Sequence, residues 1–292
     1  MSSPCLDFTR WLARSLACLT LAACTVAHAD APSDTLRVCL EPDNLPYSRA
    51  SLPGTDHGSP ARRDVDGFEW RIARLLADAL NTTLEVHWLP LRRGMVRKTF
   101  GEGHCEVMVG VPAGLERVLT TRPYYRSSYV FVTRALDGRP LQRFDDPRLP
   151  DLRIGVQLIG NDLAATPPGH ALARHGAIQG VRGYTVYGDG PASERMLRAL
   201  ARGELDAALV WGPQAGYFVR HAAVPLQMSQ ALPPNDLASM PFEFAIAVGV
   251  RQGEAALRDR LQTALDARRP EVDAILAEFA VPRTDQPDWA RP

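Results

Sequence analysis

Residues 68–88, FEWRIARLLADALNTTLEVHW, carry a helix pattern that runs directly into a strand pattern. Apolar side chains of the first part recur at helical spacing, at Phe68, Ile72, Leu75, Leu76, Ala79 and Leu80. Leu84, Val86 and Trp88 then alternate with polar residues, as in a half-buried strand, and Pro90 ends this pattern. A helix followed at once by a strand is typical of α/β proteins.

Further patterns extend this unit in both directions. Residues 36–40 predict a strand, residues 93–100 a helix that ends at the glycines after it, and residues 105–111 a second buried strand. Residues 48–67 are rich in Pro, Gly and Ser and predict an exposed loop. The resulting β-α-β-α-β order implies a parallel sheet with helices on both faces.

A second unit repeats this order farther along the chain. Residues 153–156 and 206–211 predict strands, and residues 194–201 predict a helix between them. The tail adds an apolar strand at residues 242–250 and two amphipathic helices, the second with Pro270 at its start. A chain that leaves one lobe, builds a second and returns gives a clamshell with a two-segment hinge.

The sequence therefore predicts an α/β fold of two lobes, each a mostly parallel sheet covered by helices. Lobe 1 is expected to be discontinuous, with residues 34–134 plus 242–292, and lobe 2 is expected at residues 140–225. The hinge segments are expected at residues 134–140 and 225–241, which are rich in Pro, Asp and Gly.

Residues 1–29 have the features of an export signal peptide. Arginines precede a short apolar run at residues 16–23, and a small-x-small site predicts cleavage after Ala29. An alternative stays open, because residues 21–24, LAAC, resemble a bacterial lipobox with Cys24 as the lipidated residue. We expect a periplasmic protein that contacts the membrane only if it is lipidated.

Cleavage after Ala29 would leave two of the five cysteines, Cys39 and Cys105. Two cysteines in an oxidising compartment favour one disulfide, with two buried free thiols as the alternative. The pair would be neighbours if the predicted strand order is 2-1-3. Two cysteines are too few for a structural zinc site.

Charge and motifs exclude several functional classes. The chain has 33 Lys+Arg and 33 Asp+Glu, so it lacks the basic excess expected of a nucleic-acid-binding protein. It contains no G-x-S-x-G, H-E-x-x-H or P-loop motif, no dinucleotide-binding motif and no grouped histidines. We expect no catalytic residues, no metal and no cofactor; an exported hydrolase is the weaker alternative.

Several strings resemble type II periplasmic solute-binding proteins. They are Gly67-Phe68-Glu69 at the start of the first long helix, residues 110–125 with Glu116-Arg117, and residues 244–251. A narrower likeness, over roughly residues 36–282, is to the MoxJ/XoxJ type, the binding-protein-like components encoded with quinoprotein methanol dehydrogenases. The strings that carry it are RVC (37–39), NLPYS (44–48), PLRRG (90–94), Cys105, GVPAG (110–114), LTTRPYY (119–125), GVQLIGND (155–162) and VWGP (210–213).

The resemblance implies an accessory protein that matures or activates a pyrroloquinoline-quinone (PQQ) alcohol or methanol dehydrogenase by binding it. The alternative is a receptor that delivers a small polar or organic solute to an ABC permease. In amino-acid binders of this fold, the arginine matching Arg117 holds the ligand carboxylate. An aspartate that receives the ammonium usually follows the strand matching residues 207–210, where this chain has Trp211-Gly212-Pro213. An ammonium would lack a partner there, which weakens the amino-acid interpretation.

The candidate cleft residues lie mostly at predicted strand ends, where open α/β sheets bind ligands. They are Asn44, Tyr47, Arg117, Tyr124, Tyr125, Gln157, Asn161, Asp162 and Trp211. The two adjacent tyrosines are expected to form an aromatic wall where a loop that faces the hinge meets the cleft. Other interpretations stay open: one tyrosine or Trp211 in the core, an exposed Arg117, and a plain turn at residues 160–162.

Overall fold

The computed structural model of the protein describes residues 35–50, 65–90, 94–159, 164–186 and 190–286. Its strands are β1 (Thr35–Leu40), β2 (Asp43–Asn44), β3 (Ser48–Arg49), β4 (Thr83–Trp88), β5 (Val107–Pro112), β6 (Val118–Thr120), β7 (Tyr125–Arg134), β8 (Ile154–Ile159), β9 (Ala164–Ala165), β10 (Val181–Thr185), β11 (Ala207–Trp211), β12 (Leu226–Gln230) and β13 (Glu243–Arg251). Its α-helices are α1 (Phe68–Ala79), α2 (Pro167–Arg174), α3 (Ala192–Ala201), α4 (Gly212–Arg220), α5 (Ala255–Ala267) and α6 (Arg269–Glu278). Short helical turns are η1 (Arg97–Gly101), η2 (Leu149–Asp151) and η3 (Asn235–Leu237). In the described part of the chain, no helix is long and apolar enough to cross a membrane.

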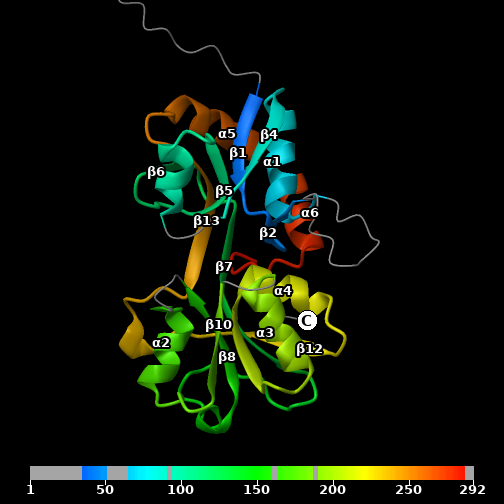
Figure 1. Ribbon diagram of the computed structural model, residues 1–292, viewed down its shortest axis with the longest axis vertical. Helices are drawn as coiled ribbons and strands as arrows, with labels where there is room; N and C mark the ends of the chain where they lie inside the picture. Colours follow the sequence, from blue (N-terminus) through cyan, green and yellow to red (C-terminus); the bar gives the residue numbers. More distant parts are fainter. Residues whose placement is uncertain (1–34, 51–64, 91–93, 160–163, 187–189, 287–292) are drawn as a thin grey trace, which may run out of the picture. The chain divides into compact units, whose positions relative to one another are not determined.

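Most strands belong to one sheet with the order β10-β8-β11-β7-β13-β5-β1-β4 (Figure 1). The first and last described segments share one lobe, and the middle of the chain forms the other. The strands β4, β1 and β5 are parallel in the first lobe, and β10, β8 and β11 are parallel in the second. The predicted α/β fold of two helix-covered, mostly parallel sheets is confirmed.

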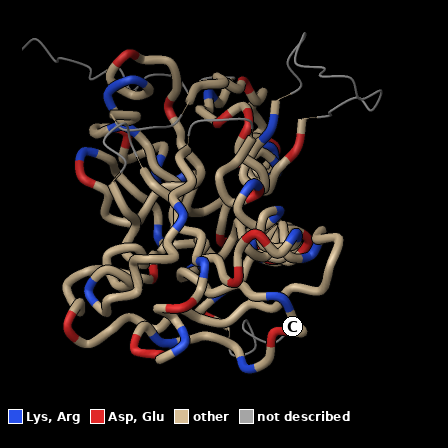
Figure 2. Tube along the Cα trace, turned by 60° about the horizontal axis from the view of Figure 1, so that its bottom comes forward, with Lys and Arg blue, Asp and Glu red and all other residues tan. Residues whose placement is uncertain are grey.

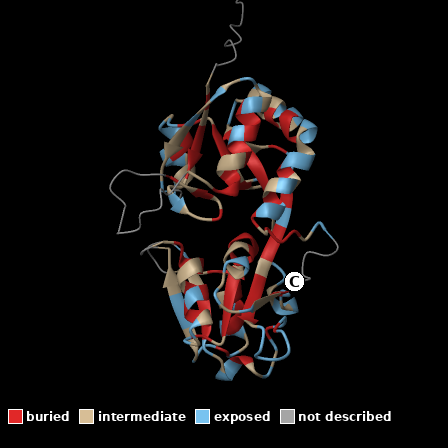
Figure 3. Cartoon of the chain, turned by 90° about the vertical axis from the view of Figure 1, so that its right-hand side faces the viewer, coloured by how far each residue is buried: buried red, intermediate tan, exposed pale blue. Residues whose placement is uncertain are grey.

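The predicted β-α-β unit is present in the first lobe. The apolar positions of α1 face the sheet, where Phe68, Ile72 and Leu76 are fully buried. This helix is covered by α5 and α6 from the end of the chain, and their Leu261 and Leu276 join the same core. Figure 3 shows the result, with buried strands inside and helices that keep exposed outer faces.

Charged groups of opposite sign lie next to each other along the chain (Figure 2). Arg153 and Asp206 make a 2.7 Å ion pair, and Arg148 and Asp146 make another at 2.7 Å. Most such pairs are partly exposed, so each contributes little to stability. The balanced composition is thus distributed as local pairs rather than as a patch of one sign.

Four elements differ from the sequence expectations. Strand β11 ends just before Gly212-Pro213, as expected, but helix α4, which begins at Gly212, and strand β7 were not expected. The helix expected at residues 93–100 is described only as a short turn that includes η1. The segment expected as the second linker, residues 225–241, contains strand β12, which pairs with β7. The lobe boundaries and hinge segments stay predictions.

Cys39 and Cys105 form a disulfide with their Cα atoms 5.6 Å apart. Both residues are fully buried, in a cluster with Phe100, Met108 and Val118. The strand β1 lies between β4 and β5, which is the 2-1-3 order under which the two cysteines were expected to be neighbours. The predicted disulfide therefore links β1 to the segment just before β5.

We predict that replacing both Cys39 and Cys105 by Ala lowers the free energy of unfolding by about 2–4 kcal/mol, because the bond closes a long loop in the unfolded chain. The loop spans a sequence separation of 66 residues. Urea unfolding followed by circular dichroism measures the loss. Wild-type protein in a thiol reductant is the control, because reduction breaks the bond but keeps both sulfur atoms in the core. Equal free energies of unfolding for the oxidised and reduced proteins would contradict the prediction.

The segment after α6 returns to the middle of the molecule and packs between β7 and α4. The Ser127 hydroxyl donates to the carbonyl of Pro282 at 2.7 Å, and Arg220 donates to the carbonyl of Glu278 at 2.7 Å. A Cβ atom on Gly216 of α4 would lie 1.9 Å from the carbonyl oxygen of Ala280. This close approach explains a glycine inside a helix, where glycine is otherwise unfavourable.

We predict that Gly216→Ala lowers the free energy of unfolding by about 1–3 kcal/mol, because the added methyl group overlaps a backbone atom. Gly101→Ala is the matched control, since the nearest atom to its Cβ is 3.5 Å away, which is ordinary contact. Thermal and urea unfolding of both variants measure the difference. Two variants of equal stability would show that the tail moves aside without loss.

Candidate functional site

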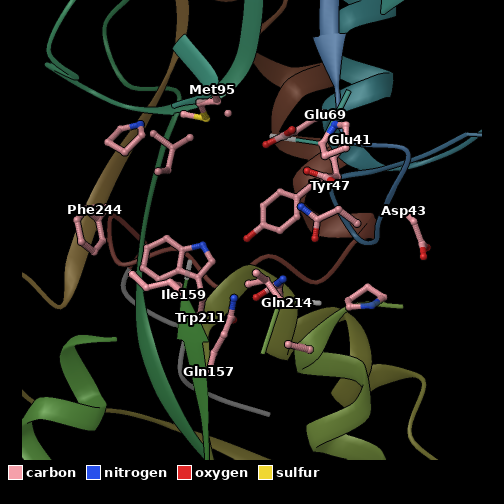
Figure 4. Close-up of a pocket in the computed structure, with 18 of the residues that line it drawn as sticks. Glu41, Asp43, Tyr47, Glu69, Met95, Gln157, Ile159, Trp211, Gln214 and Phe244 are labelled. Atoms are coloured by element: carbon pink, nitrogen blue, oxygen red, sulfur yellow. The ribbon is translucent and has the colours of Figure 1, made fainter. Parts of the chain in front are cut away.

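A cavity of about 660 Å³ lies beside the strands that connect the two lobes (Figure 4). The first lobe contributes residues that follow β1, start α1 and form β5. The second lobe contributes the ends of β8 and β11 and the starts of α3 and α4. The lining residues include Glu41, Asp43, Asn44, Tyr47, Glu69, Met95, Met108, Gly110, Pro112, Tyr125, Tyr129, Gln157, Trp211, Gln214 and Phe244.

Aromatic rings form one wall of the cavity. Trp211 lies 5.3 Å from Tyr129 and 5.6 Å from Phe244, measured between ring centroids. Both contacts are edge-to-face, the favourable geometry for such pairs. The three residues come from β11, β7 and β13, so the pairing of these strands places them together.

Tyr47 and Trp211 join the two lobes across the cavity. The hydroxyl of Tyr47 points toward the indole of Trp211 (Figure 4). Desolvation of this hydroxyl raises the pKa of Tyr47 well above its usual value, and the charges of Tyr125 and Glu69 raise it further. Tyr47 therefore stays neutral and serves as a hydrogen-bonding group.

Acidic side chains are the charged groups of the cavity wall. Glu69 and Glu41 point into the cavity, whereas Asp43 lies at its edge (Figure 4). Among the described residues that line the cavity, none is Lys, Arg or His. The described part of the wall thus offers negative charge, hydroxyls, amides and rings.

Glu69 is a buried acid near the start of α1. Its backbone N–H donates to the carbonyl of Tyr47 at 2.9 Å, and only 7% of the residue is exposed. A Cβ atom on Gly110 would lie 1.7 Å from Oε1 of Glu69, so the glycine of β5 provides the space for the carboxyl group. Burial raises the pKa of Glu69 to about 8, with a further increase from Glu41.

The carboxyl group of Glu69 has no hydrogen-bond or ion-pair partner within the described parts of the chain. The nearby hydroxyl of Tyr124 is also buried without a partner there. Burial raises the pKa of Tyr124 well above its usual value, and the charge of Glu69 adds to the increase. Strongly shifted acids in a cavity are candidates for functional groups.

The structure brings five of the nine predicted cleft residues together. Asn44, Tyr47, Tyr125, Gln157 and Trp211 all line the cavity. Asn44 and Tyr47 lie in and after the short strand β2, Tyr125 starts β7, Gln157 lies within β8, and Trp211 ends β11. Their role in binding stays a prediction.

The other four lie elsewhere or outside the described residues. Tyr124 is buried in the core of the first lobe, next to Tyr125, which starts strand β7 rather than lying in a loop. The side chain of Arg117 is 82% exposed between β5 and β6 and does not line the cavity. Asn161 and Asp162 lie outside the described residues.

The most important residue that the sequence analysis missed is Glu69. Its signal is a charge on the apolar face of a helix, one turn before Ile72 and next to Phe68. Gln214, Tyr129 and Phe244 were also missed. They lie on elements, α4, β7 and β13, whose arrangement depends on distant segments.

Comparison with known proteins identifies the family. The model of the family described as "Bacterial extracellular solute-binding protein" matches residues 113–279. Protein MoxJ of Methylorubrum extorquens is 31% identical over 285 residues, which cover 90% of this chain and 86% of that protein. The chain belongs to the bacterial extracellular solute-binding protein family and is of the MoxJ/XoxJ type.

Solved structures of this type have the same fold. The periplasmic binding protein XoxJ of Methylobacterium extorquens AM1 is 30% identical, with a TM-score of 0.67, covering 86% of this chain and 100% of that one. MxaJ of Methlophaga aminisulfidivorans MPT is 25% identical, with a TM-score of 0.70, covering 85% and 99%. A binding-protein-like function is therefore shown for this solute-binding family member.

We predict that Glu69→Gln removes a pH-dependent loss of stability. Burial raises the pKa of Glu69 to about 8 in the folded protein, whereas the ordinary pKa of 4.5 applies to the unfolded chain. The native state thus binds more protons between these values, and its free energy of unfolding falls as the pH rises through them.

The variant should equal wild type at pH 4.5 and exceed its stability by roughly 1–4 kcal/mol at pH 8.5. Urea unfolding at pH 4.5, 6.5 and 8.5 gives the comparison. Glu116→Gln is the matched control, because that side chain is 90% exposed. If the free energy of unfolding of wild type changed with pH as little as that of Glu69→Gln, the prediction would be wrong.

Proposed function

We propose that this chain is a periplasmic accessory protein that binds a PQQ-dependent methanol or alcohol dehydrogenase during maturation or activation. The observation that carries this proposal is the likeness to MoxJ over 90% of the chain. The likeness to XoxJ over that whole structure supports it. Export with cleavage after Ala29 belongs to the same proposal, with lipidation at Cys24 as the alternative.

The charges of the cavity argue against a receptor for free amino acids. Such a ligand needs a cationic group for its carboxylate as well as an acid for its ammonium. The described cavity wall offers acids without a guanidinium, and Arg117 is exposed away from it. The buried Glu69 changes one part of the sequence argument, because an ammonium has a carboxylate available after all.

A second candidate function is a receptor for a small organic solute. The observation that favours it is the cavity itself, since about 660 Å³ lies within the range of small-molecule sites. Its aromatic wall and few polar groups are also typical of such sites. Under this alternative the protein would deliver its ligand to an ABC permease.

We propose that the cleft holds a segment of the dehydrogenase, with Trp211 as an anchor. Aromatic side chains in desolvated pockets carry much of the binding energy at protein interfaces. Trp211 is half-buried, contacts rings from β7 and β13, and faces the cavity from the second lobe. A partner segment seated against it would contact both lobes.

We predict that deleting the gene lowers the active dehydrogenase in periplasmic extracts at least about tenfold, and that Trp211→Ala fails to restore it, since truncating a central aromatic anchor removes about 2 kcal/mol or more. Leu136→Ala is the matched control, because Leu136 is 92% exposed and does not line the cavity. Co-purification of the dehydrogenase with each tagged variant measures binding directly. Unchanged dehydrogenase in the deletion strain, together with no co-purification, would reject the proposal.

A further inference from the structure

We infer that the cavity is a binding site for a single positively charged amino group, held by the carboxylate of Glu69 beside the rings of Tyr47 and Tyr125. A free amine and a lysine side chain of a protein partner present the same chemistry. The lysine source rests on the proposed function, and the free amine does not. The site would take a cation, not a zwitterion or an anion.

The first observation is an acid that is built into the cavity without a partner. Glu69 is more than nine-tenths buried, lines the cavity, and has no hydrogen bond or ion pair to its carboxyl group among the described residues. A buried carboxylate without a partner is unfavourable, so a bound cation would stabilise its charged form. The acid is thus poised for a group that the described chain does not supply.

The second observation is the space that the chain keeps for this carboxyl group. A Cβ atom on Gly110 of β5 would lie 1.7 Å from Oε1 of Glu69, so a larger residue there would displace the carboxyl group. Met108 and Pro112 also line this part of the cavity, so the carboxyl group emerges from an apolar surface. The fold therefore fixes the acid in the wall rather than at the solvent.

The third observation is the set of rings around the acid. Tyr47 and Tyr125 both line the cavity and both pack against Phe68, at centroid distances of 5.1 and 6.1 Å. Each has its pKa raised in part by the charge of Glu69, so both hydroxyls lie within its field. Aromatic rings beside a carboxylate are a favourable environment for an ammonium group.

The charge balance selects a cation over other ligands. Glu41 faces the cavity beside Glu69, and no described lining residue carries a positive charge to hold an anion. An anion would meet the buried Glu69, and the carboxylate of a zwitterion would find no cationic partner among the described lining residues. A lone amino group on an apolar chain satisfies the acid and the rings together.

Binding of a cation is linked to release of a proton. The groups that face Glu69 are Glu41 after β1, Tyr47 after β2, and Tyr124 and Tyr125 at the start of β7. The pKa of Glu69 in the empty cavity is about 8, so the carboxyl group is largely protonated at pH 7. An arriving ammonium favours the carboxylate, and the proton leaves to the solvent.

The first arm of the test is isothermal titration of the mature protein with benzylamine and butylamine. Benzyl alcohol and butanol are neutral controls of the same shape. The amines should bind saturably, the alcohols at least about tenfold more weakly, and Glu69→Gln should lose about tenfold or more in amine affinity, because hydrogen bonds to charged groups are worth about 1.5–3 kcal/mol. Titration in two buffers of different ionisation enthalpy should show nearly one proton released at pH 7 and few at pH 9.

Gly110→Ala is the second variant, because it keeps the acid but displaces its carboxyl group. It should lose amine affinity while its circular dichroism spectrum and unfolding midpoint report whether it folds. Glu116→Gln, at an exposed position, is the matched control and should bind as wild type. Equal amine affinity of wild type and Glu69→Gln would overturn the inference.

The second arm replaces the amine by a capped peptide with one lysine among alanines, compared with the same peptide carrying norleucine. If the lysine peptide binds and its binding needs Glu69, the inference is supported and the amino group comes from a protein. If only the amines bind, the inference is supported and the amino group comes from a small molecule. Absence of both overturns the inference, while dehydrogenase that still co-purifies would leave the proposed function intact. Loss of co-purification with retained amine binding would reject only the proposed function.

Discussion

The antiparallel pairing of β7 with β13 is the constraint on which the rest of the structure depends. Ser128 pairs with Glu243 and Tyr125 with Ile246, while the far half of β7 pairs with β11 and β12 in the second lobe. One continuous sheet thus connects two separate cores. Because the cavity lies beside this pair, its aromatic wall depends on backbone hydrogen bonds between segments more than 100 residues apart.

The family supplies the two-lobed frame, and the described charges of the cavity wall are acidic. Glu69 lies in the wall because Gly110 leaves room for it, and Arg117 lies outside because its loop faces solvent. Folding keeps the acid at a cost in desolvation, and proteins retain such groups mainly where they bind or react. The electrostatics of the cavity and the likeness to MoxJ point in the same direction, away from simple amino-acid uptake.

The parts of the fold that could be predicted are those with a strong local pattern. The apolar period of α1, the alternation of β4 and the run of β1 each result from residues near one another in the chain. Helix α4 was missed because Gly212 and Gly216 argue against a helix. Gly212 is required by the close approach of Ser127 and Ser128 of β7, and Gly216 by the close approach of Ala280 in the tail. At this helix, packing against a distant segment outweighed the local helix propensity.

The sequence by itself determined the α/β class and the strand ends that carry Asn44, Tyr47 and Trp211, and it favoured the disulfide between Cys39 and Cys105. The first two follow from short-range periodicity and from the rule that such sheets bind ligands at strand ends, and the disulfide follows from two cysteines in an oxidising compartment. Only the tertiary structure decided that Glu69 faces the cavity and Arg117 does not. The direction and the charged neighbours of a side chain depend on contacts across the whole chain, which no local pattern encodes.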